Sequence, residues 1–184
     1  MSIYLLPEVN LMIRSRLLAT LKPGTRIVSH DYGMGNWLPD YQEELAAPGK
    51  TVGIGQRSKI LYWVVPGHAA GRWRWSMAID GKPAAFDLSL QQNFQMLEGA
   101  LAAGGRSSQI EKGRLTGESI EVSTTLDHTR YELSGRIVNN AIEGKVRVTA
   151  GGATREVPWS ATRVEIWDER HAGLTSEQSV KEMH

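Results

Sequence analysis

Two stretches in the first third of the chain carry residue types that can do acid–base chemistry. They are Leu6, Pro7 and Glu8 in one stretch, and Ser29, His30, Asp31 and Tyr32 in the other. A histidine can act as a general base near neutral pH, and a neighbouring carboxylate can fix its tautomer. The same residues have a local alternative, because polar side chains at a strand end hydrogen-bond nearby backbone and an acid in the first turn of a helix is favoured by the helix dipole.

The elements that must position these residues are predicted as strand, helix and strand. Residues 2–6 (SIYLL) predict a short buried strand, Pro7 opens a helix that ends near Thr20, and residues 25–32 (TRIVSHDY) predict a second strand. The apolar positions at helical spacing, predicted to be the buried face, are Val9, Met12, Ile13, Leu17 and Leu18. Such a unit is a right-handed crossover between parallel strands, and ligands lie beyond the carboxyl ends of parallel strands. The two stretches are therefore pocket candidates.

Two glycine pairs look like phosphate-binding loops but lack the required context. Gly33 and Gly35 follow a strand, yet Pro39 comes too soon after them for a helix to begin through the preceding residues. The segment VGIGQRS (52–58) precedes a strand-like run instead of a helix. Both segments are predicted to be ordinary loops.

Residues 58–167 predict an antiparallel β meander. The expected strands are KILYWVV, RWRWSMAI, AAFDLSL, NFQMLEGAL, SIEVSTT, YELSGRIV, AIEGKVRV and VPWSATRVEIW, separated by the turn pairs Asp80-Gly81, Gly104-Gly105, Asn139-Asn140 and Gly151-Gly152. About eight such strands predict a closed barrel or a two-sheet sandwich, because closure removes unpaired edges. The fold class is then α+β, with residues 1–57 forming a βαβ remnant of a Rossmann-like sheet, 58–167 the β domain and 168–184 a polar tail.

Alternation within the strands assigns the faces of the β domain. Trp73 and Trp75 are predicted to point inward, and Arg72 and Arg74 outward. Ala84, Phe86, Leu88 and Leu90 share one face, and with Phe94 the large aromatic residues predict an interior filled by side chains.

Composition limits the classes of partner. The net charge is +1 and no long run of like charges occurs, which predicts neither a nucleic acid nor a membrane partner. The chain has no cysteine, and its five histidines lie at spacings that metal motifs do not use, so no metal site is expected. No signal peptide or membrane-spanning stretch is recognised, and the expectation is a soluble, cytoplasmic protein.

Residues 4–31 (YLLPEVNLMIRSRLLATLKPGTRIVSHD) resemble the fourth strand, following helix and fifth strand of bacterial class I S-adenosylmethionine-dependent methyltransferases. The later segments ILYWVVPGHAAGRWRW, FDLSLQQNFQMLEGAL and WSATR resemble the C-terminal β extension that some of these proteins carry. The resemblance implies a Rossmann-like methyltransferase fold and S-adenosylmethionine as cofactor. The strand, glycine turn and acidic residue that hold this cofactor in the family would precede Tyr4, so the chain alone is not expected to bind it or to be catalytically competent.

The chain departs from this resemblance inside its best motif. Relatives usually read Asp-Phe-Asp-Met-Gly-Asp-Trp after the serine and histidine, whereas Gly33 and Asn36 stand here in place of two of the carboxylates. Trp37, which matches the motif, joins the pocket candidates. No catalytic residue and no methyl acceptor is assigned by the resemblance, although a small-molecule substrate is compatible with it.

Two functions of different class follow. One is the C-terminal segment of a methyltransferase, and the other is a β-barrel module that binds a small ligand or a protein partner. The first accounts for the N-terminal βαβ unit, whose strands are apolar on both faces and need cover. That cover can come from the β domain, from a missing N-terminal half or from a second copy, and a homodimer is the expected arrangement of the chain alone.

Overall fold

The computed structural model describes residues 1–51, 56–79 and 81–167 of the 184-residue chain. The chain divides into two compact units, Met1–Pro66 and Gly67–His184, and each is described by itself. Most of the VGIGQRS loop, Asp80 of one turn pair, and the polar tail with His171 and His184 lie outside the described residues. In the part of the chain that is described, no helix has the length and apolar character needed to cross a membrane.

The first unit begins with two parallel strands joined by a helix. These are β1 (Ser2–Ile3), α1 (Pro7–Thr20) and β2 (Arg26–His30), and Ile3 lies opposite Ser29 in the register. The parallel pairing and the bounds of α1 confirm the predicted unit. Strand β1 is shorter than predicted, because the backbone of Leu6 is already the extended N-cap that leads into Pro7. That the unit is the remnant of a larger Rossmann-like sheet stays a prediction.

Two further strands complete this sheet. They are β3 (Tyr41–Ala46) and β4 (Arg57–Val64), and the strand order is β1-β2-β4-β3, with β4 antiparallel to both of its neighbours. The sequence interpretation placed the segment KILYWVV in the β domain, and this was wrong: Leu61 and Trp63 pair with Ser29 and Ile27 of β2. The boundary between the units consequently falls after Pro66 instead of after residue 57.

Helix α1 buries two polar residues beside Leu17, the one fully buried member of the five predicted apolar positions. Its buried residues are Asn10, Arg14 and Leu17, while the side chain of Met12 is 80% exposed. Asn10 Nδ2 donates to the carbonyls of Tyr32 and Gly33, both at 3.2 Å, and Arg14 Nη1 donates to Met34 O at 2.8 Å. The segment after β2 thus packs on the helix through its backbone carbonyls, and these need donors rather than apolar side chains.

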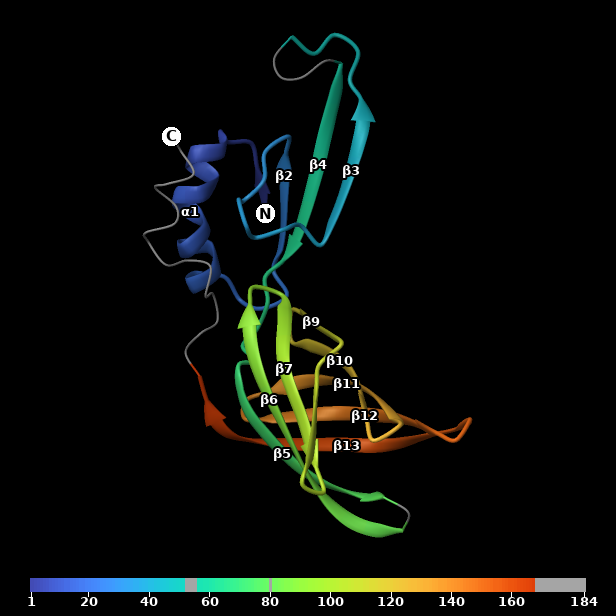
Figure 1. Ribbon diagram of the computed structural model, residues 1–184. Coiled ribbons are helices and arrows are strands. Elements are labelled where there is room, and N and C mark those ends of the chain that lie inside the picture. Colours follow the sequence, from blue (N-terminus) through green and yellow to red (C-terminus); the bar gives the residue numbers. More distant parts are fainter. Residues whose placement is uncertain (52–55, 80, 168–184) are drawn as a thin grey trace. The chain divides into compact units, whose positions relative to one another are not determined.

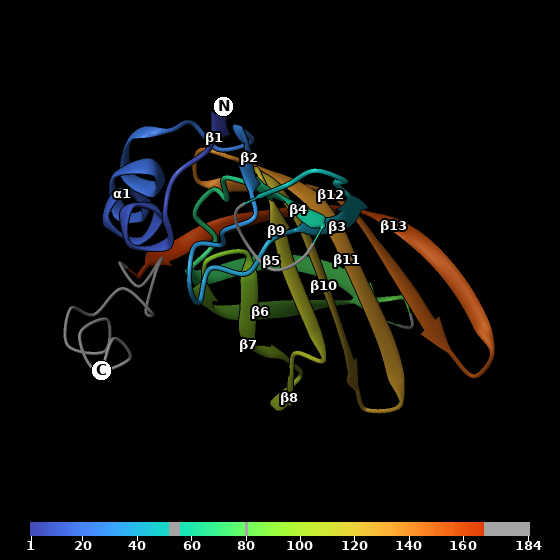
Figure 2. The same ribbon diagram turned by 90° about the horizontal axis from the view of Figure 1, so that it is seen from above.

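The described part of the second unit contains nine strands. They are β5 (Gly71–Ile79), β6 (Lys82–Asn93), β7 (Met96–Ala103), β8 (Arg106–Gln109), β9 (Lys112–Thr116), β10 (Ser119–Leu126), β11 (Thr129–Val138), β12 (Ala141–Ala150) and β13 (Ala153–Ile166). Pairing runs β6-β5-β13-β12-β11-β10-β9-β7, and β6 also pairs with β7, so eight antiparallel strands close into a barrel (Figures 1 and 2). Strand β8 pairs with β7 outside this circuit. Of the two predicted architectures the barrel is right, although Lys112–Thr116 takes the place that the sequence interpretation gave to KILYWVV.

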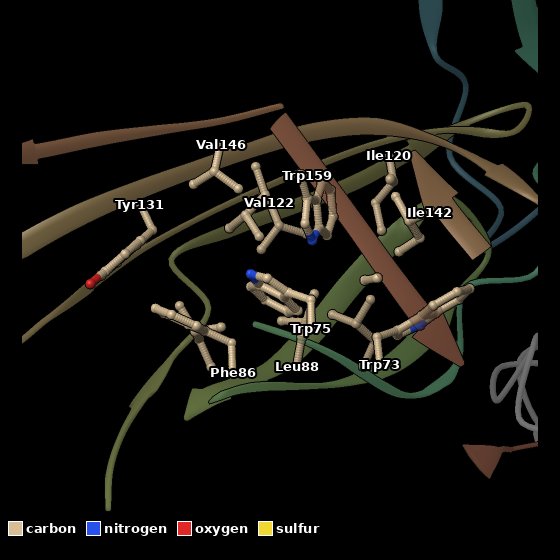
Figure 3. Packing of buried hydrophobic residues seen from close by; sticks show 14 of the residues in the cluster. Trp73, Trp75, Phe86, Leu88, Ile120, Val122, Tyr131, Ile142, Val146 and Trp159 are labelled. Carbon is tan, nitrogen blue, oxygen red and sulfur yellow. The ribbon is translucent and has the colours of Figure 1, made fainter. Parts of the chain in front are cut away.

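Inward-facing side chains fill the barrel as the alternation predicted. Trp73, Trp75, Phe86 and Leu88 are buried in one hydrophobic cluster that also contains Trp159 (Figure 3). Arg72 and Arg74 are exposed, and Phe94 is buried in the turn between β6 and β7. The predicted hairpin turns at Gly104-Gly105 and Gly151-Gly152 have positive φ at both glycines, which is the backbone that a two-residue hairpin turn requires.

Candidate functional site

The carboxyl ends of β1 and β2 bring an aromatic ring and an imidazole together. Tyr4 directly follows β1 and His30 ends β2, and their rings stack with centroids 4.9 Å apart and planes 28° from parallel. The side chain of Tyr4 is otherwise open, with 77% of the residue exposed. Parallel neighbours place these two residues side by side, because Ile3 and Ser29 are opposite in the register and each next residue turns to the other face.

Asp31 follows His30 in the left-handed backbone region, with φ at 64°. Aspartate tolerates this region better than most residues. Its backbone N–H donates to Lys59 O at 2.7 Å, and Lys59 N donates to Asp31 Oδ1 at 2.9 Å. The Lys50 ammonium donates to Asp31 Oδ2 and also to Arg57 O at 2.8 Å. Strand β4 and the β3–β4 connection therefore fix the carboxylate in place.

The groups around Asp31 favour its ionised form. The Lys50 ammonium is the largest cause that lowers the pKa of Asp31, and the Lys59 N–H and the nearby His30 lower it further, while desolvation acts against them. Asp31 is consequently ionised at neutral pH and serves as an electrostatic anchor. It does not supply a proton there.

His30 lies against this anchor. Its Nδ1 is 3.3 Å from Asp31 Oδ2, but no hydrogen bond of acceptable geometry joins the two atoms. Its side chain is 28% exposed, so a ligand at this edge of the sheet can reach the ring. We call Tyr4, His30, Asp31 and Lys50 the β2-end cluster. An imidazole held between an exposed aromatic ring and a fixed carboxylate can accept and release a proton. That Asp31 sets its tautomer stays a prediction.

The remaining sequence candidates are not all at this cluster. Ser29 is buried and donates to Tyr32 O at 2.7 Å, which matches the local alternative for a polar residue at a strand end. Leu6, Pro7 and Glu8 are exposed at the start of α1.

Trp37 and Asn36 belong to the packing of the first unit. Trp37 is fully buried beside Trp63, whose indole donates to Trp37 O at 2.9 Å. Asn36, one of the two departures from the resemblance, accepts a hydrogen bond from Arg14 Nη1 at 2.5 Å. The side-chain oxygen of Asn36 thus has a structural role at this position. The role of Trp37 in a pocket remains a prediction.

Sequence reasoning missed Tyr4 and Lys50 as members of the cluster. Tyr4 was assigned to the first strand, where its tyrosine ring gave no chemical signal. Lys50 is 19 residues from Asp31 and reaches it only because β3 and β4 fold back as a hairpin. To place Lys50 near Asp31, one must know that β4 pairs with β2. No local sequence pattern shows this pairing.

A separate hollow of about 890 Å³ lies on the outer face of the barrel unit. Five acidic and five basic side chains line it, together with the buried Ser123. Two of its arginines are paired, since Arg130 contacts Glu111 and also Glu132 on its own strand, and Arg147 contacts Glu132 on the neighbouring strand. Thr125 and then Arg130 lower the pKa of Glu111 by hydrogen bonding. This ladder of mutual pairs gives the hollow no excess of either charge. No cluster of three or more metal-ligating side chains occurs among the described residues.

Comparison with known proteins finds a similarity to one solved structure, over part of the chain. No family model matches the chain, and no curated protein matches it. Among solved structures, a crystal structure of an RNA methyltransferase from Salinibacter ruber in complex with S-adenosyl-L-homocysteine is similar, at 35% sequence identity and a TM-score of 0.28. The similarity covers 37% of this chain and 38% of that one. The chain thus spans well under half of the length of this neighbour, and a TM-score this low does not establish a shared fold.

Proposed function

We propose that this chain is the C-terminal part of an S-adenosylmethionine-dependent methyltransferase and that its β2-end cluster lies on the methyl-acceptor side of the active site. The observation that carries the proposal is the stacked Tyr4–His30 pair beside the ionised Asp31, at the carboxyl ends of two parallel strands joined by a helix. Ligands of open parallel sheets bind at this edge. The resemblance of residues 4–31 supplies the reaction class.

The residues present do not form a cradle for the cofactor. A cofactor cradle needs glycine backbone that a ligand can approach. Gly35 is turned toward α1, where an added Cβ would come within 2.8 Å of Leu11 Cδ2 and 3.0 Å of Arg14 Nη1. The first strand is followed by Tyr4, Leu5 and Leu6, with no glycine before α1. The cofactor-binding residues are accordingly proposed to lie on another polypeptide segment.

His30 is the proposed general base. Methylation of a neutral acceptor at an O–H or N–H group releases a proton as the methyl–sulfur bond breaks, and an imidazole that is 28% exposed can take that proton. Asp31 and Lys50 act as positioning residues, because their ion pair holds the backbone that carries His30. Tyr4 covers one face of the imidazole and limits its rotation. The acceptor is proposed to be a small molecule.

An uncovered surface on the first unit supports the need for a second segment. Strand β1 pairs with β2 alone among the described strands, so its other edge is open. Apolar residues are exposed in the segment that follows β1 and on α1: Tyr4, Leu5, Leu6, Val9 and Met12. Burial of such side chains contributes roughly 1.5–3 kcal/mol each, so a complementary segment would bind here. We assign this surface, the β1-edge surface, to the cofactor-binding half.

The test is methyl transfer by a reconstituted pair. The chain is mixed with the polypeptide encoded directly upstream of Met1, and transfer of radioactive methyl groups from S-adenosylmethionine into a small-molecule extract is counted. The mixture should transfer label, and His30→Gln should lower the rate by about 10²-fold or more, as expected for loss of a general base. Arg16→Gln, an exposed change on α1 away from the pocket candidates, is the control and should leave the rate within about twofold. A His30→Gln mixture as active as the wild type would remove His30 from the mechanism.

A further inference from the structure

The hollow on the outer face of the barrel unit plays no part in the proposed function. Its volume of about 890 Å³ falls within the range of small-ligand sites, about 300–1,000 Å³. Strands β9, β10, β11 and β12 lie side by side and all contribute to its lining (Figure 2). Val122 of β10 belongs to the barrel core, so its neighbours Glu121 and Ser123 face outward and line the hollow. The hollow thus lies outside the filled interior.

Two serines lie at positions whose cross-strand neighbours carry long charged side chains. Ser123 is opposite Lys112 of β9 and Glu132 of β11, and Ser134 of β11 is opposite Glu121. A serine side chain ends well short of the tip of a lysine or glutamate, so the serines form the floor of the hollow and the charged side chains its rim. Ser123 is 8% exposed, and its hydroxyl has no hydrogen-bond partner among the described residues. Such a group gains when a ligand supplies a partner.

Most of the charged groups on the rim neutralise one another. Six of the ten charged side chains that line the hollow belong to one ladder of ion pairs: Glu111, Arg130, Glu132, Arg147, Glu156 and Lys145. A ligand with a net charge would meet as many groups of its own sign as of the opposite sign. The rim therefore favours a ligand that is neutral overall.

Charges of both signs remain outside this ladder. In the part of the chain that the structure describes, no ion pair or side-chain hydrogen bond engages Lys112, Glu98 or Glu121. Arg114, the tenth charged residue, contacts Met96 Sδ at 3.9 Å. Because Arg114 lies opposite Glu121 in the register, Lys112 is a diagonal neighbour of Glu121, about 7–8 Å away at Cα. An ammonium and a carboxylate on adjacent strands are thus both available to a ligand.

The hollow also has an apolar side. Met96 is 49% exposed, and Ile110 is a partly buried residue that packs against the barrel core. Both line the hollow, and a methionine side chain adapts readily to the shape of an apolar group. A ligand with an apolar portion therefore gains burial here in addition to its polar contacts.

We infer that this hollow binds a zwitterion of the α-amino-acid type that carries an apolar side chain. The ligand carboxylate pairs with the Lys112 ammonium, and the ligand ammonium pairs with the Glu121 carboxylate. The apolar side chain lies against Met96 and Ile110. The Ser123 hydroxyl reaches the ligand carboxylate by rotation about its Cα–Cβ bond. This site is independent of the proposed methyltransferase chemistry in the first unit.

Two other kinds of occupant would behave differently. A neutral polyol would use the charged side chains as hydrogen-bond partners and would need no charge of its own. A singly charged molecule would use Lys112 or Glu121 alone. In neither case would the hollow require both charges of an amino acid.

The test uses L-leucine and two probes that each lack one of its charged groups. 3-Methylbutylamine lacks the carboxylate, 4-methylpentanoate lacks the ammonium group, and glucose represents the polyols. The whole chain is labelled with ¹⁵N, and the amide signals of β9, β10 and β11 are followed as each probe is added. Leucine should shift these signals saturably and bind at least about tenfold more tightly than any of the other three, a difference of about 1.4 kcal/mol.

Two variants remove one charge each at exposed positions. Lys112→Gln should weaken leucine binding at least about fivefold and leave 3-methylbutylamine binding within about twofold. Glu121→Gln should weaken leucine binding equally and leave 4-methylpentanoate binding within about twofold. Glu143→Gln, at an exposed residue of β12 that does not line the hollow, is the matched control and should leave leucine binding within about twofold.

Three results would each overturn the inference. The first is binding of glucose or of a singly charged probe as tight as that of leucine. The second is the absence of saturation up to the solubility of leucine. The third is an effect of Lys112→Gln or Glu121→Gln on leucine binding no larger than that of Glu143→Gln.

Discussion

At the scale of single residues, the β2-end cluster depends on one carboxylate held from three directions. Asp31 receives the Lys50 ammonium and the Lys59 N–H, and it faces the His30 ring. Its left-handed backbone turns the chain sharply after β2, so that His30 and Asp31 can both lie at the sheet edge. Removing the charge of Asp31 should therefore disturb local structure as well as chemistry.

The lowered pKa of Asp31 predicts a specific dependence of stability on pH. A carboxylate whose folded pKa lies below its unfolded value of about 3.9 stabilises the fold above that value, and this contribution is lost as the pH falls through the lower folded pKa. In Asp31→Asn the free energy of unfolding of the first unit should be lower than in the wild type at pH 7. Below about pH 4 it should fall less steeply than in the wild type. Urea unfolding across a pH series measures this. Parallel curves for the two proteins would show that Asp31 has no lowered pKa.

The alternation of β5 predicts a large difference between neighbouring substitutions. Trp75→Ala should lower the free energy of unfolding by about 3–5 kcal/mol, because it removes a buried aromatic side chain. Arg74→Ala should change it by no more than about 0.5 kcal/mol, since Arg74 is exposed and its ion pair with Asp87 is at the surface. Chemical denaturation of both variants gives the comparison. Equal losses would contradict the assignment of faces.

At the scale of elements, α1 shows where sequence patterns are informative. Pro7 at the first position and the break after Thr20 predicted its bounds, because these signals act within one or two turns. Its buried face was not predictable from periodicity, since Asn10 and Arg14 are buried by carbonyls of the segment that follows β2. Where a helix packs against backbone carbonyls, its covered side carries polar donors, here beside the buried Leu17.

This interpretation of α1 predicts unequal effects at two arginines. Arg14→Met should lower the free energy of unfolding of the first unit by about 2–3 kcal/mol, because it leaves the buried Met34 carbonyl without its charged donor. Arg16→Met, an exposed change two residues away, should cost at most about 0.5 kcal/mol. Thermal or urea unfolding of both variants checks this. A harmless Arg14→Met would mean that the buried polar residues do not hold the segment in place.

The barrel was predictable as an antiparallel meander, yet not strand by strand. Alternation and turn pairs act between neighbours in sequence, which explains why the faces of β5 and β6 were right. The assignment of β4 failed because the segment KILYWVV is apolar enough for either sheet, and its partners in β2 are 30 to 38 residues away in the sequence. The short strand β9 escaped notice because Lys112–Thr116 carries only Leu115 as a large apolar residue.

At the scale of the whole molecule, the two units present different surfaces. The barrel closes its strands on one another and buries its apolar side chains. The first unit leaves one edge of β1 without a partner strand among the described residues, and it exposes apolar residues after β1 and on α1. An open edge next to an apolar surface promotes association, because backbone groups and side chains both gain partners.

The chain alone is therefore expected to dimerise through the β1-edge surface. Light scattering over a concentration series should approach twice the 20.4 kDa mass of one chain. Met12→Glu should shift this equilibrium toward the monomer, because a carboxylate would have to lose its hydration at the interface. Met96→Glu, at an exposed methionine of the barrel unit, is the control and should leave it unchanged. A strictly monomeric wild type would show that the β1-edge surface does not pair with a second copy.

Calorimetric titration with S-adenosyl-L-homocysteine tests most directly the claim that this chain needs another segment to hold the cofactor. The chain alone should give no saturable heat, because Gly35 is packed against α1 and no glycine stands between β1 and α1. The chain mixed with the polypeptide encoded directly upstream should bind, with a dissociation constant on the order of micromolar. Micromolar binding by the chain alone would contradict the account.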